Sequence, residues 1–598
     1  MCGIAGLITH HSSFFPVEQF IRPMQAALRH RGPDDAGIYL SPNHQVALAH
    51  TRLAILDLSD AGHQPMATPD GRYWITFNGE IYNFQELRSE LEIQGETFRS
   101  HTDTEVILKL YRRYGKTCIQ YLQGMFAFAI WDDHEKSCFL ARDPLGIKPL
   151  YYCQSESTLG FASELRALLA SGLTQRQLCP QGLYGYLRTG SVPEPYTLIE
   201  GIHCLEAGHW LYWQQGNLKK ESYWSFQFNS DQSLIPDAQD RVRQALLDSV
   251  KSHYVSDVPV GVFLSGGIDS TALVALSRQM QSSPLHTFSI AFEEAEWNEG
   301  DVARQVADYF DTQHTEFMVT ADLGRSLLPR FLNSIDQPSI DGFNTFCVSK
   351  IAHDAGMKVV LSGLGGDELF GGYQSFRQLP KMLKIGQLLQ SVKPVTYALG
   401  KSLETWGPSA KLRRIGDFLR QDPTLFAAYH SFRGLFSHAE ACQILQVYLP
   451  GAEFPPRQVF EVQRSDSPTL ADQISILELS RYMRNQLLRD SDVMSMAWGL
   501  ELRVPLVDRI LVETLTQVPS NQRLLPGKQL LIQSVGNIPE FVTNRPKRGF
   551  FFPYEQWMQN EWKDLAKSAR QFHNIPLTPW YRRWSLIILQ HWWQQICS

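Results

Sequence analysis

The first two hundred residues alternate short apolar runs with a few segments of helical spacing. Apolar runs of strand length lie at residues 3–9, 46–49, 73–77, 125–131, 137–141 and 149–152. Helical spacing is found between them, at residues 84–94 and 104–114. Because regular alternation of strand and helix is missing, the pattern predicts an α+β domain of stacked layers. Strand fragments at 207–228 extend this domain as far as a polar stretch at 229–237 that is typical of a linker.

The rhythm changes after this stretch. Helical segments at 238–253, 270–281 and 301–310 alternate with apolar strands at 258–264, 285–292, 314–319 and 358–361. Such alternation predicts an α/β domain with a parallel sheet covered on both faces by helices. From residue 376 to the end, helical patterns rich in Leu, Arg and Trp dominate. The sequence therefore predicts two domains of different class, at residues 2–215 and 235–598.

Composition narrows the class of protein. A chain of 598 residues is long enough for about two to four domains. A net charge of -6 over this length gives no case for a nucleic acid or an anionic membrane as partner. The nine cysteines are scattered and odd in number, which argues against a disulfide framework or a zinc site and for a reducing compartment. Without a basic segment before residues 4–8, or an apolar run of membrane-spanning length, the expected location is the cytoplasm.

The first candidate for chemistry is Cys2, which only Met1 precedes. Removal of Met1 leaves a thiol and a free α-amino group on one residue. A thiol is a strong nucleophile near neutral pH, and an α-amino group titrates near pH ~8 and can act as its base. This pairing suits attack on an amide carbonyl. Taken alone, a buried cysteine in an apolar strand is the simpler interpretation of Cys2.

Further polar residues supply the other groups that amide hydrolysis through a thioester needs. Asn78 can donate its side-chain amide, and Gly79 its backbone N–H, to a developing oxyanion. Arg52 can clamp a carboxylate through two hydrogen bonds, and Asp103 can hold an ammonium group. Each has a simpler alternative, since Asn78-Gly79 is a favourable hairpin turn and Arg52 can pair with Asp57 on the surface.

Together these segments resemble the glutaminase domain of the class II glutamine amidotransferases, a branch of the N-terminal-nucleophile hydrolases. The matching segments are Cys-Gly-Ile at 2–4, His-Arg-Gly-Pro-Asp at 30–34, Asn-Gly-Glu-Ile-Tyr-Asn at 78–83, Gln-Gly-Met-Phe-Ala-Phe at 123–128, Arg-Asp-Pro-Leu-Gly at 142–146 and Ala-Ser-Glu at 162–164. The resemblance implies αββα layers, Cys2 as nucleophile, and Asn78 and Gly79 as oxyanion hole. It also implies a glutamine pocket formed by Arg52, Ile55, Leu56, Glu80 and Asp103. The products would be glutamate and ammonia.

A glycine-rich turn stands at the start of the predicted parallel sheet. The strand at 258–264 runs into Ser-Gly-Gly-Ile-Asp-Ser at 265–270 and then into a helix. Such a turn lets backbone N–H groups converge on an anion, and the helix N-terminus adds its dipole. Ser265 and Ser270 can donate hydroxyls to phosphate oxygens, and Asp269 can hold a magnesium ion. The turn is not a Walker A loop, because the Gly-Lys-Ser/Thr ending is missing, and by itself it can equally be a tight turn.

A second glycine-rich loop strengthens this prediction. The apolar strand at 358–361 ends in Ser-Gly-Leu-Gly-Gly-Asp-Glu at 362–368. Ligands of open parallel sheets bind in the crevice at the carboxyl ends of the strands. A second loop of this kind at a strand's carboxyl end strengthens the prediction of a phosphate site.

The segment Ser-Gly-Gly-x-Asp-Ser resembles the pyrophosphate-binding motif of the ATP pyrophosphatases, which activate a carboxyl group as an adenylate. With a glutaminase domain in front, the chain is similar nearly end to end to the glutamine-hydrolysing asparagine synthetases. Met-Ser-Met-Ala at 494–497, Glu-Leu-Arg-Val-Pro-Leu-Val-Asp at 501–508 and Arg-Pro-Lys at 545–547 fit the same family. The resemblance implies an ATP site formed by Leu264, Ser265, Gly266, Gly267, Asp269, Ser270, Ile290, Ser362 and Gly363.

The same resemblance assigns the cations of the site. It implies Mg²⁺ on Asp269 and Asp367, and Lys547 as the catalytic residue that offsets charge on the α-phosphate and the leaving pyrophosphate. Without the family, an exposed basic loop at 545–548 is the simpler interpretation of Lys547.

The acceptor implied by the resemblance is aspartate, with asparagine, AMP and pyrophosphate as products. Leu364 departs from the family, which carries a glutamate there that could take a proton from the attacking ammonium; Glu368 or a water must then substitute. Asp341 is an acid in the segment, 338–342, where the family helps bind aspartate. Amidation of another carboxylic acid therefore stays open.

A regulatory protein with an inactive synthetase domain is the remaining alternative. The intact Ser-Gly-Gly-x-Asp-Ser segment and Asp367 argue against it. The expected partners are small-molecule substrates, with no nucleic acid and no membrane, and a homodimer is left open.

Overall fold

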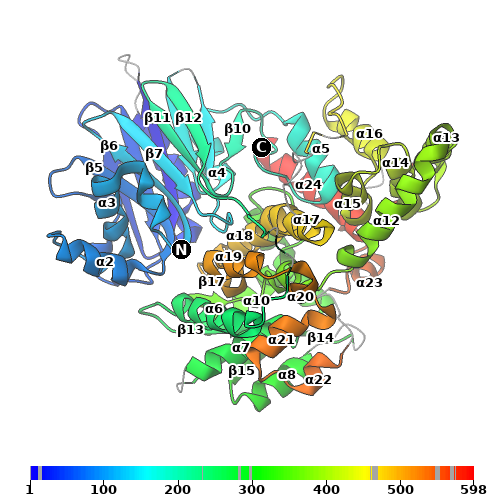
Figure 1. The fold of residues 1–598 in the computed structure, drawn as a ribbon. Helices are drawn as coiled ribbons and strands as arrows, with labels where there is room; N and C mark the ends of the chain where they lie inside the picture. The colour runs from blue at the N-terminus through cyan, green and yellow to red at the C-terminus, as the bar shows by residue number, and fades with distance from the viewer. Residues whose placement is uncertain are drawn as a thin grey trace.

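The computed structural model in Figure 1 describes most of the chain. The described residues are 2–10, 17–155, 157–229, 231, 233–280, 284–294, 300–457, 459–460, 469–545, 552–565, 572 and 574–597. Three sheets, two antiparallel and one parallel, provide its framework.

The N-terminal half holds the two antiparallel sheets, with strand orders β10-β8-β9-β1-β3-β2 and β12-β11-β7-β6-β5-β4. The first contains β1 (Gly3–Thr9), β2 (Asp35–Leu40), β3 (Val46–Arg52), β8 (Tyr151–Gln154), β9 (Thr158–Ala162) and β10 (Ile202–Cys204). The second contains β4 (Met66–Ala67), β5 (Tyr73–Ile81), β6 (Gly124–Asp132), β7 (Ser137–Arg142), β11 (His209–Gln214) and β12 (Asn217–Ser222). Apolar side chains of both sheets, such as Ile4 of β1 and Ala127 of β6, share one core between them.

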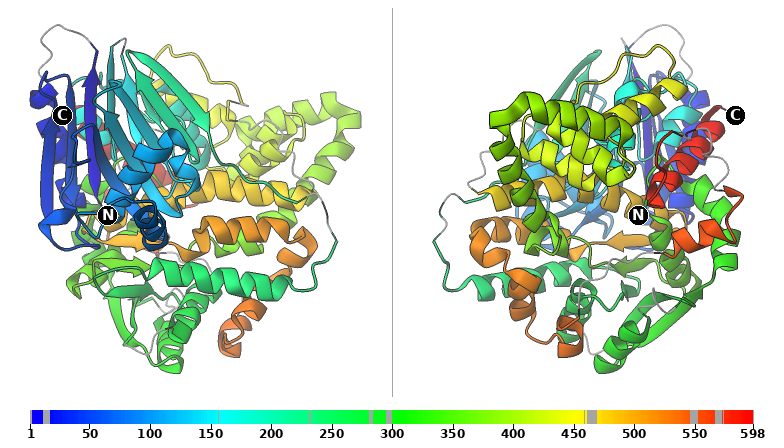
Figure 2. Two further views of the ribbon diagram at one scale, coloured as in Figure 1. Left: turned by 60° about the vertical axis from the view of Figure 1, so that its left-hand side comes forward. Right: turned by 90° about the vertical axis from the view of Figure 1, so that its right-hand side faces the viewer.

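Helices cover the outer face of each sheet. Helices α1 (Val17–Ala27) and α4 (Leu165–Ala170) lie on the first sheet and share a core with β1. Helices α2 (Phe84–Ile93) and α3 (Asp103–Tyr114) lie on the second sheet and share a core with β5 and β6. The αββα layering expected for this half is therefore confirmed, and Figure 2 shows the layers edge-on.

The C-terminal half contains a five-stranded parallel sheet of order β15-β14-β13-β16-β17. Its strands are β13 (Val260–Phe263), β14 (His286–Phe292), β15 (Gln313–Val319), β16 (Val359–Leu361) and β17 (Glu501–Arg503). The helices between them are α6 (Ala238–His253), which precedes β13, α7 (Ile268–Met280), α8 (Gly300–Tyr309), α9 (Ala321–Ser334) and α10 (Phe343–Asp354). The predicted α/β alternation is confirmed.

Strand β17 corrects the prediction that residues beyond 376 are helical throughout. Its three residues pair in parallel with β16, with Leu361 opposite Arg503. A three-residue strand with charged residues at both ends carries no apolar alternation, so only pairing with β16 defines it.

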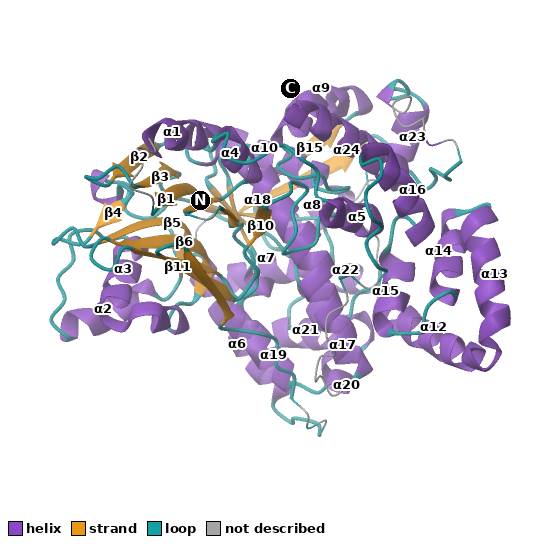
Figure 3. Cartoon of the chain, turned by 90° about the horizontal axis from the view of Figure 1, so that it is seen from above, coloured by secondary structure: helices purple, strands orange, loops and turns teal. Residues whose placement is uncertain are grey.

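The remaining helices build the rest of the C-terminal half (Figure 3). They are α5 (Pro180–Thr189), which belongs to the connection from the N-terminal half, and α11 (Gly366–Phe370), α12 (Ser375–Leu389), α13 (Lys393–Trp406), α14 (Ala410–Leu419), α15 (Leu425–Arg433), α16 (His438–Tyr448), α17 (Leu470–Leu477), α18 (Arg489–Met496), α19 (Arg509–Gln517), α20 (Ser520–Arg523), α21 (Gln529–Val535), α22 (Glu540–Thr543), α23 (Tyr554–Gln559) and α24 (Tyr581–Cys597). A π-helical segment, Glu478–Leu488, joins α17 to α18. No helix among the described residues has the length and apolarity needed to cross a membrane.

Buried charged contacts join the two halves. The backbone N–H groups of Leu165 and Arg166, at the start of α4, donate to the Asp336 carboxylate at 2.8 and 2.9 Å. The Arg31 guanidinium lies 2.8 Å from Asp492 of α18. Because such pairs are costly to separate, the two halves are held in one relative position.

Candidate active sites

Cys2 directly precedes β1, which pairs with β3 on one side and β9 on the other. Its backbone N–H donates to Asn78 Oδ1 at 3.0 Å, and its carbonyl accepts from Arg31 Nε at 3.1 Å. Burial raises the pKa of the Cys2 thiol above its usual value. The thiol therefore needs a nearby base to become a nucleophile, which agrees with the α-amino group expected for that role.

The predicted oxyanion residues lie in the interior of β5 rather than in a hairpin turn, so the turn interpretation of Asn78-Gly79 is wrong. Asn78 is fully buried, and its Nδ2 has no hydrogen-bond partner among the described residues. Gly79 has φ +151°, and a Cβ there would lie 2.1 Å from the Met125 carbonyl oxygen of β6. The close approach of β6 explains the glycine, and the Asn78 amide leaves a donor available near Cys2.

Arg52 ends β3 and is buried, which rules out the exposed ion pair with Asp57. Its guanidinium donates to the backbone carbonyls of Ser59, Leu56 and Asp57 at 3.0, 3.1 and 2.5 Å. These bonds hold the loop with Ile55 and Leu56 around the guanidinium. The structure thus brings these three predicted pocket residues together.

Asp103 and Glu80 lie on the other side of the predicted pocket. Asp103 begins α3, and its Oδ2 accepts from the Ile81 N–H at 2.9 Å. Burial raises the pKa of Asp103 to about 7. Burial, followed by the nearby Glu501 carboxylate, raises the pKa of Glu80 well above its usual value. An ammonium group bound here would stabilise the ionised form of such a carboxyl.

The first glycine-rich loop of the C-terminal half connects β13 to α7. Ser265 Oγ and Ser270 Oγ lie 3.1 Å apart, and Gly266 has φ +72°. The Leu264 N–H donates to the Phe288 carbonyl of β14 at 2.8 Å, and Ile290 further along β14 is buried. The loop therefore stands at the carboxyl end of its strand, where the sequence predicts a phosphate site.

The second glycine-rich loop, after β16, touches the first. A Cβ at Gly363 would lie 2.9 Å from the Ser270 backbone nitrogen, and one at Gly366 would lie 2.3 Å from Asp269 Oδ1. The Ser362 N–H donates to the Arg503 carbonyl at 2.8 Å. The predicted ATP residues of both loops therefore form one surface.

Lys528 is a site residue that the sequence analysis missed. Its Nζ lies 2.6 and 2.7 Å from the two Asp269 oxygens and also forms an ion pair with Asp367. Burial alone would lower the pKa of Lys528, but the two carboxylates raise it overall. The only local signal in the sequence was Gly527, since a glycine is typical of a turn. In the structure both Gly527 and Lys528 have positive φ.

The two carboxylates that contact Lys528, those of Asp269 and Asp367, are also the residues expected to hold Mg²⁺. Oxygen donors suit Mg²⁺, which commonly uses one or two carboxylates together with phosphate oxygens. No cluster of three or more acidic, His or Cys side chains that could hold a metal occurs in the described part of the chain. Asp269 and Asp367 supply oxygen donors of the kind that Mg²⁺ uses together with phosphate oxygens, and in this structure both carboxylates contact Lys528. Lys547, the predicted charge-offsetting residue, lies outside the described residues.

Three residues bear on the choice of acceptor. They are Glu368, which was expected to substitute as a base, and the two departures from the family pattern, Asp341 and Leu364. Glu368 is buried and accepts a hydrogen bond from the Tyr373 hydroxyl at 2.9 Å, and burial followed by Asp367 raises its pKa to about 8. Asp341 is also buried, which raises its pKa. Leu364 is partly buried and packs against the main core.

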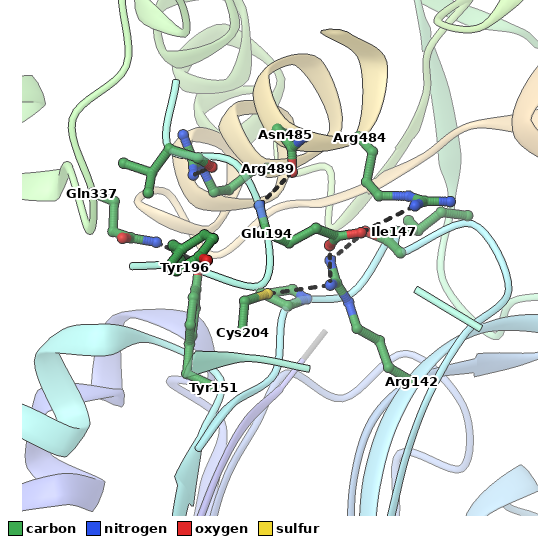
Figure 4. Close-up of a pocket in the computed structure, with 13 residues that line it drawn as sticks. Arg142, Ile147, Tyr151, Glu194, Tyr196, Cys204, Gln337, Arg484, Asn485 and Arg489 are labelled. Carbon is green, nitrogen blue, oxygen red and sulfur yellow. Dashed lines mark hydrogen bonds and ion pairs between the residues drawn. The ribbon is translucent and has the colours of Figure 1, made fainter. Parts of the chain in front are cut away.

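A small pocket lies between the two halves, and none of the predicted site residues lines it. Figure 4 shows Glu194 at its centre, bridging Arg142 at 2.8 Å and Arg484 at 3.0 Å. Cys204 Sγ accepts from Arg142 at 3.2 Å. Arg489 also lines the pocket and donates to the Val192 carbonyl at 3.0 Å, so three arginines and a single carboxylate face this space.

Comparisons with known proteins find two family models along the chain. Residues 1–224 match the family model described as a glutamine amidotransferase domain, and residues 241–582 match the model described as asparagine synthase. The chain belongs to the asparagine synthase family. This family member is 33% identical over 581 residues to asparagine synthetase [glutamine-hydrolyzing] 1 of Bacillus subtilis, covering 96% of this chain and 90% of the relative.

Other relatives cover less of the chain. Asparagine synthetase B [glutamine-hydrolyzing] of Escherichia coli is 32% identical over 438 residues, covering 69% of this chain and 73% of the relative. Amidase chry2 of Gibberella zeae is 31% identical over 408 residues, covering 63% and 60%. The chain is therefore similar in sequence to relatives that carry different names.

Proposed function

We propose that the protein hydrolyses glutamine at Cys2 and uses the ammonia to convert aspartate to asparagine at the two glycine-rich loops, with ATP as energy source. Residues 2–215 would form the glutaminase domain and residues 235–598 the synthetase domain, in the cytoplasm. The observation that carries the proposal is the Asn78 amide, whose Oδ1 holds the Cys2 backbone at 3.0 Å while its Nδ2 stays available as a donor.

In the glutaminase half, the Cys2 thiol would pass its proton to the α-amino group and attack the side-chain amide of glutamine. Asn78 Nδ2 and the Gly79 N–H would stabilise the oxyanion, and ammonia would leave as the thioester forms. Water would then release glutamate from the thioester. Arg52 and Asp103 would bind the carboxylate and ammonium groups of glutamine.

In the synthetase half, the aspartate side-chain carboxylate would attack the α-phosphate of ATP and release pyrophosphate. Ammonia would then displace AMP from the acyl-adenylate and leave an amide. Ser265, Ser270 and the backbone of residues 265–267 would bind phosphate oxygens. Mg²⁺ held by Asp269 and Asp367 would neutralise phosphate charge, and Lys528 offers a further cation to the same group.

The experiment is a product assay on the purified protein. Glutamine, ATP, Mg²⁺ and millimolar aspartate should yield asparagine, glutamate, AMP and pyrophosphate in equal amounts. Absence of asparagine under these conditions rejects aspartate as acceptor.

A second candidate is the amidation of a different carboxylic acid. Leu364 in place of the family's glutamate and the buried Asp341 both favour it, since they alter the surroundings of the acceptor. An acceptor screen that follows pyrophosphate release separates the two: release only with another acid supports the second candidate.

A further inference from the structure

Helices α12 and α13 form the edge of the molecule that lies opposite the two antiparallel sheets, as Figures 1 and 3 show. A short 3-10 turn, Gln390–Val392, joins the two helices. We call residues 381–406 the α12–α13 corner. None of the residues assigned to the two proposed active sites lies in it.

Helix α13 turns small and polar side chains toward the protein. Its buried residues are Thr396, Gly400 and Glu404. A Cβ at Gly400 would lie 2.8 Å from the Gly416 carbonyl oxygen of α14, so the two helices approach closely there. A surface helix of a globular protein usually buries an apolar stripe instead. The inward packing of α13 therefore leaves its large apolar side chains unused.

The large apolar side chains of the corner are exposed to solvent. On α13, Val395 is 67% exposed, Leu399 52% and Trp406 77%. Because positions four and seven residues apart share one face of a helix, these three side chains form a single stripe. Near the end of α12, Leu388 is 76% exposed. Exposed apolar residues that gather in this way mark an interaction surface.

The exposed charges around this stripe are positive. Within residues 369–421, every one of which the structure describes, the only acidic residues are Glu404 and Asp417. Both are buried and form ion pairs with arginines. Just beyond this range, Asp422 pairs with Lys393 at 2.8 Å. The exposed charged residues within it are all basic: Arg377, Lys381, Lys384, Lys393, Lys401 and Lys411. The net charge of -6 for the whole chain therefore conceals a surface of the opposite sign.

This combination favours an anionic lipid surface over other partners of a basic surface. Two copies of the chain related by a two-fold axis would bring the same positive charges together. A nucleic acid is held mainly through its phosphates, which offer no contact to exposed leucine and valine side chains. At a bilayer surface, lysine ammonium groups meet anionic headgroups, while leucine, valine and tryptophan side chains enter the boundary beneath them.

We propose that the α12–α13 corner docks the protein onto the anionic surface of a membrane. Leu388, Val395 and Leu399 enter the interface, and Lys381 and Lys384 contact headgroup phosphates. Both lysines share one face of α12 with Leu388, because the three positions follow helical spacing. The contact is peripheral, since the apolar residues form a stripe rather than a wholly apolar helix. This inference is independent of the proposed active sites.

The test is co-sedimentation of the purified protein with lipid vesicles. Wild type should bind vesicles of phosphatidylglycerol and phosphatidylcholine in equal amounts, but not vesicles of phosphatidylcholine alone, and binding should weaken as salt increases. Lys381→Gln combined with Lys384→Gln should weaken binding by about tenfold or more, since each lysine near an anionic surface contributes on the order of fivefold. Leu388→Glu combined with Val395→Glu should abolish it, because carboxylates would replace the inserted apolar groups.

Ile93→Glu is the matched control, because Ile93 of α2 is 87% exposed and lies outside the corner. It should bind the anionic vesicles as wild type does. All the substituted side chains are exposed, so the thermal midpoint should stay unchanged in every variant.

Three results would overturn the proposal. The first is a wild type that does not bind the anionic vesicles, which leaves an acidic protein as the partner of this surface. The second is unchanged binding by Leu388→Glu with Val395→Glu, because adsorption would then depend on charge alone. The third is a wild-type dimer that this variant converts to a monomer in light scattering, because the corner would then be an interface between copies.

Discussion

Asn78 uses only one end of its side-chain amide in a hydrogen bond. Its oxygen fixes the Cys2 backbone, and its nitrogen remains a donor without a described partner. A buried donor of this kind is costly to maintain unless it acts on something that arrives later. At the residue scale, the unsatisfied Asn78 amide therefore marks the proposed glutaminase site, in addition to the predicted nucleophile Cys2.

Asn78→Ala should lower glutaminase kcat by about 10²–10³-fold, since one oxyanion donor is removed. Steady-state glutamate release measures the effect. Ammonia-dependent synthesis is the internal control and should be unchanged. A loss smaller than about threefold would exclude Asn78 from the oxyanion hole.

We expect the Asp103 carboxyl to make the rate of glutamine hydrolysis depend on pH. Its carboxyl must be ionised to hold the substrate's ammonium group, and burial raises its pKa to about 7 in the free protein. Glutaminase kcat/KM should therefore show a fall as pH decreases through about 7, in addition to the titration of the α-amino base near pH ~8. Alkylation of Cys2 by iodoacetamide serves as the control, because it follows the thiol alone; identical profiles for both reactions would contradict the assignment.

Sequence alone could identify the residues that stand in a local motif, such as Cys2 and Asp269. It could not identify Lys528, because an ion pair with Asp269 depends on the fold and has no sequence spacing of its own. Nor could it predict that Arg503 pairs with Glu80, since the two residues lie in different halves of the chain.

At the element scale, the two glycine-rich loops are packed so closely that one supports the other. The absence of a side chain at Gly363 permits contact with the backbone of residue Ser270. The sequence predicted both strand-to-helix turns, because their apolar strands and glycines are local signals. Strand β17 was missed, because its pairing partner, not its own pattern, determines it.

Gly363→Ala should separate the loops, since its Cβ would lie 2.9 Å from a backbone nitrogen that cannot move independently. We expect KM for ATP to rise by about tenfold or more while glutaminase kcat without ATP is unchanged. Pyrophosphate release at varied ATP measures it. A variant with wild-type KM for ATP would show that the loop contact is not part of the nucleotide site.

At the scale of the whole molecule, two chemistries occupy two halves joined by buried ion pairs. The layered class of the N-terminal half could be predicted, because its family motifs fall on β1, β5 and β6, but α1, α4 and β2 were not among the predicted elements. The contacts between the halves, such as Arg31 with Asp492, could not be predicted, since each is defined only after both halves have folded.

The division of labour predicts reciprocal losses. Cys2→Ala should abolish glutamine-dependent synthesis and spare synthesis from ammonium salts, whereas Asp269→Ala should abolish pyrophosphate release and spare basal glutaminase. Glutamate, AMP and pyrophosphate assays on both folded variants measure the outcome. Loss of every activity in a folded Cys2→Ala protein would contradict independent sites.

The bridge from Lys528 to Asp269 and Asp367 has a practical consequence for handling the protein. A built-in counter-ion keeps the two acidic groups compensated before any nucleotide arrives, so the resting fold has no need of divalent ions. Dialysis against a chelator should leave the melting temperature unchanged, as differential scanning fluorimetry can check. Lys528→Met should instead melt at a lower temperature in chelator and regain stability when magnesium is added.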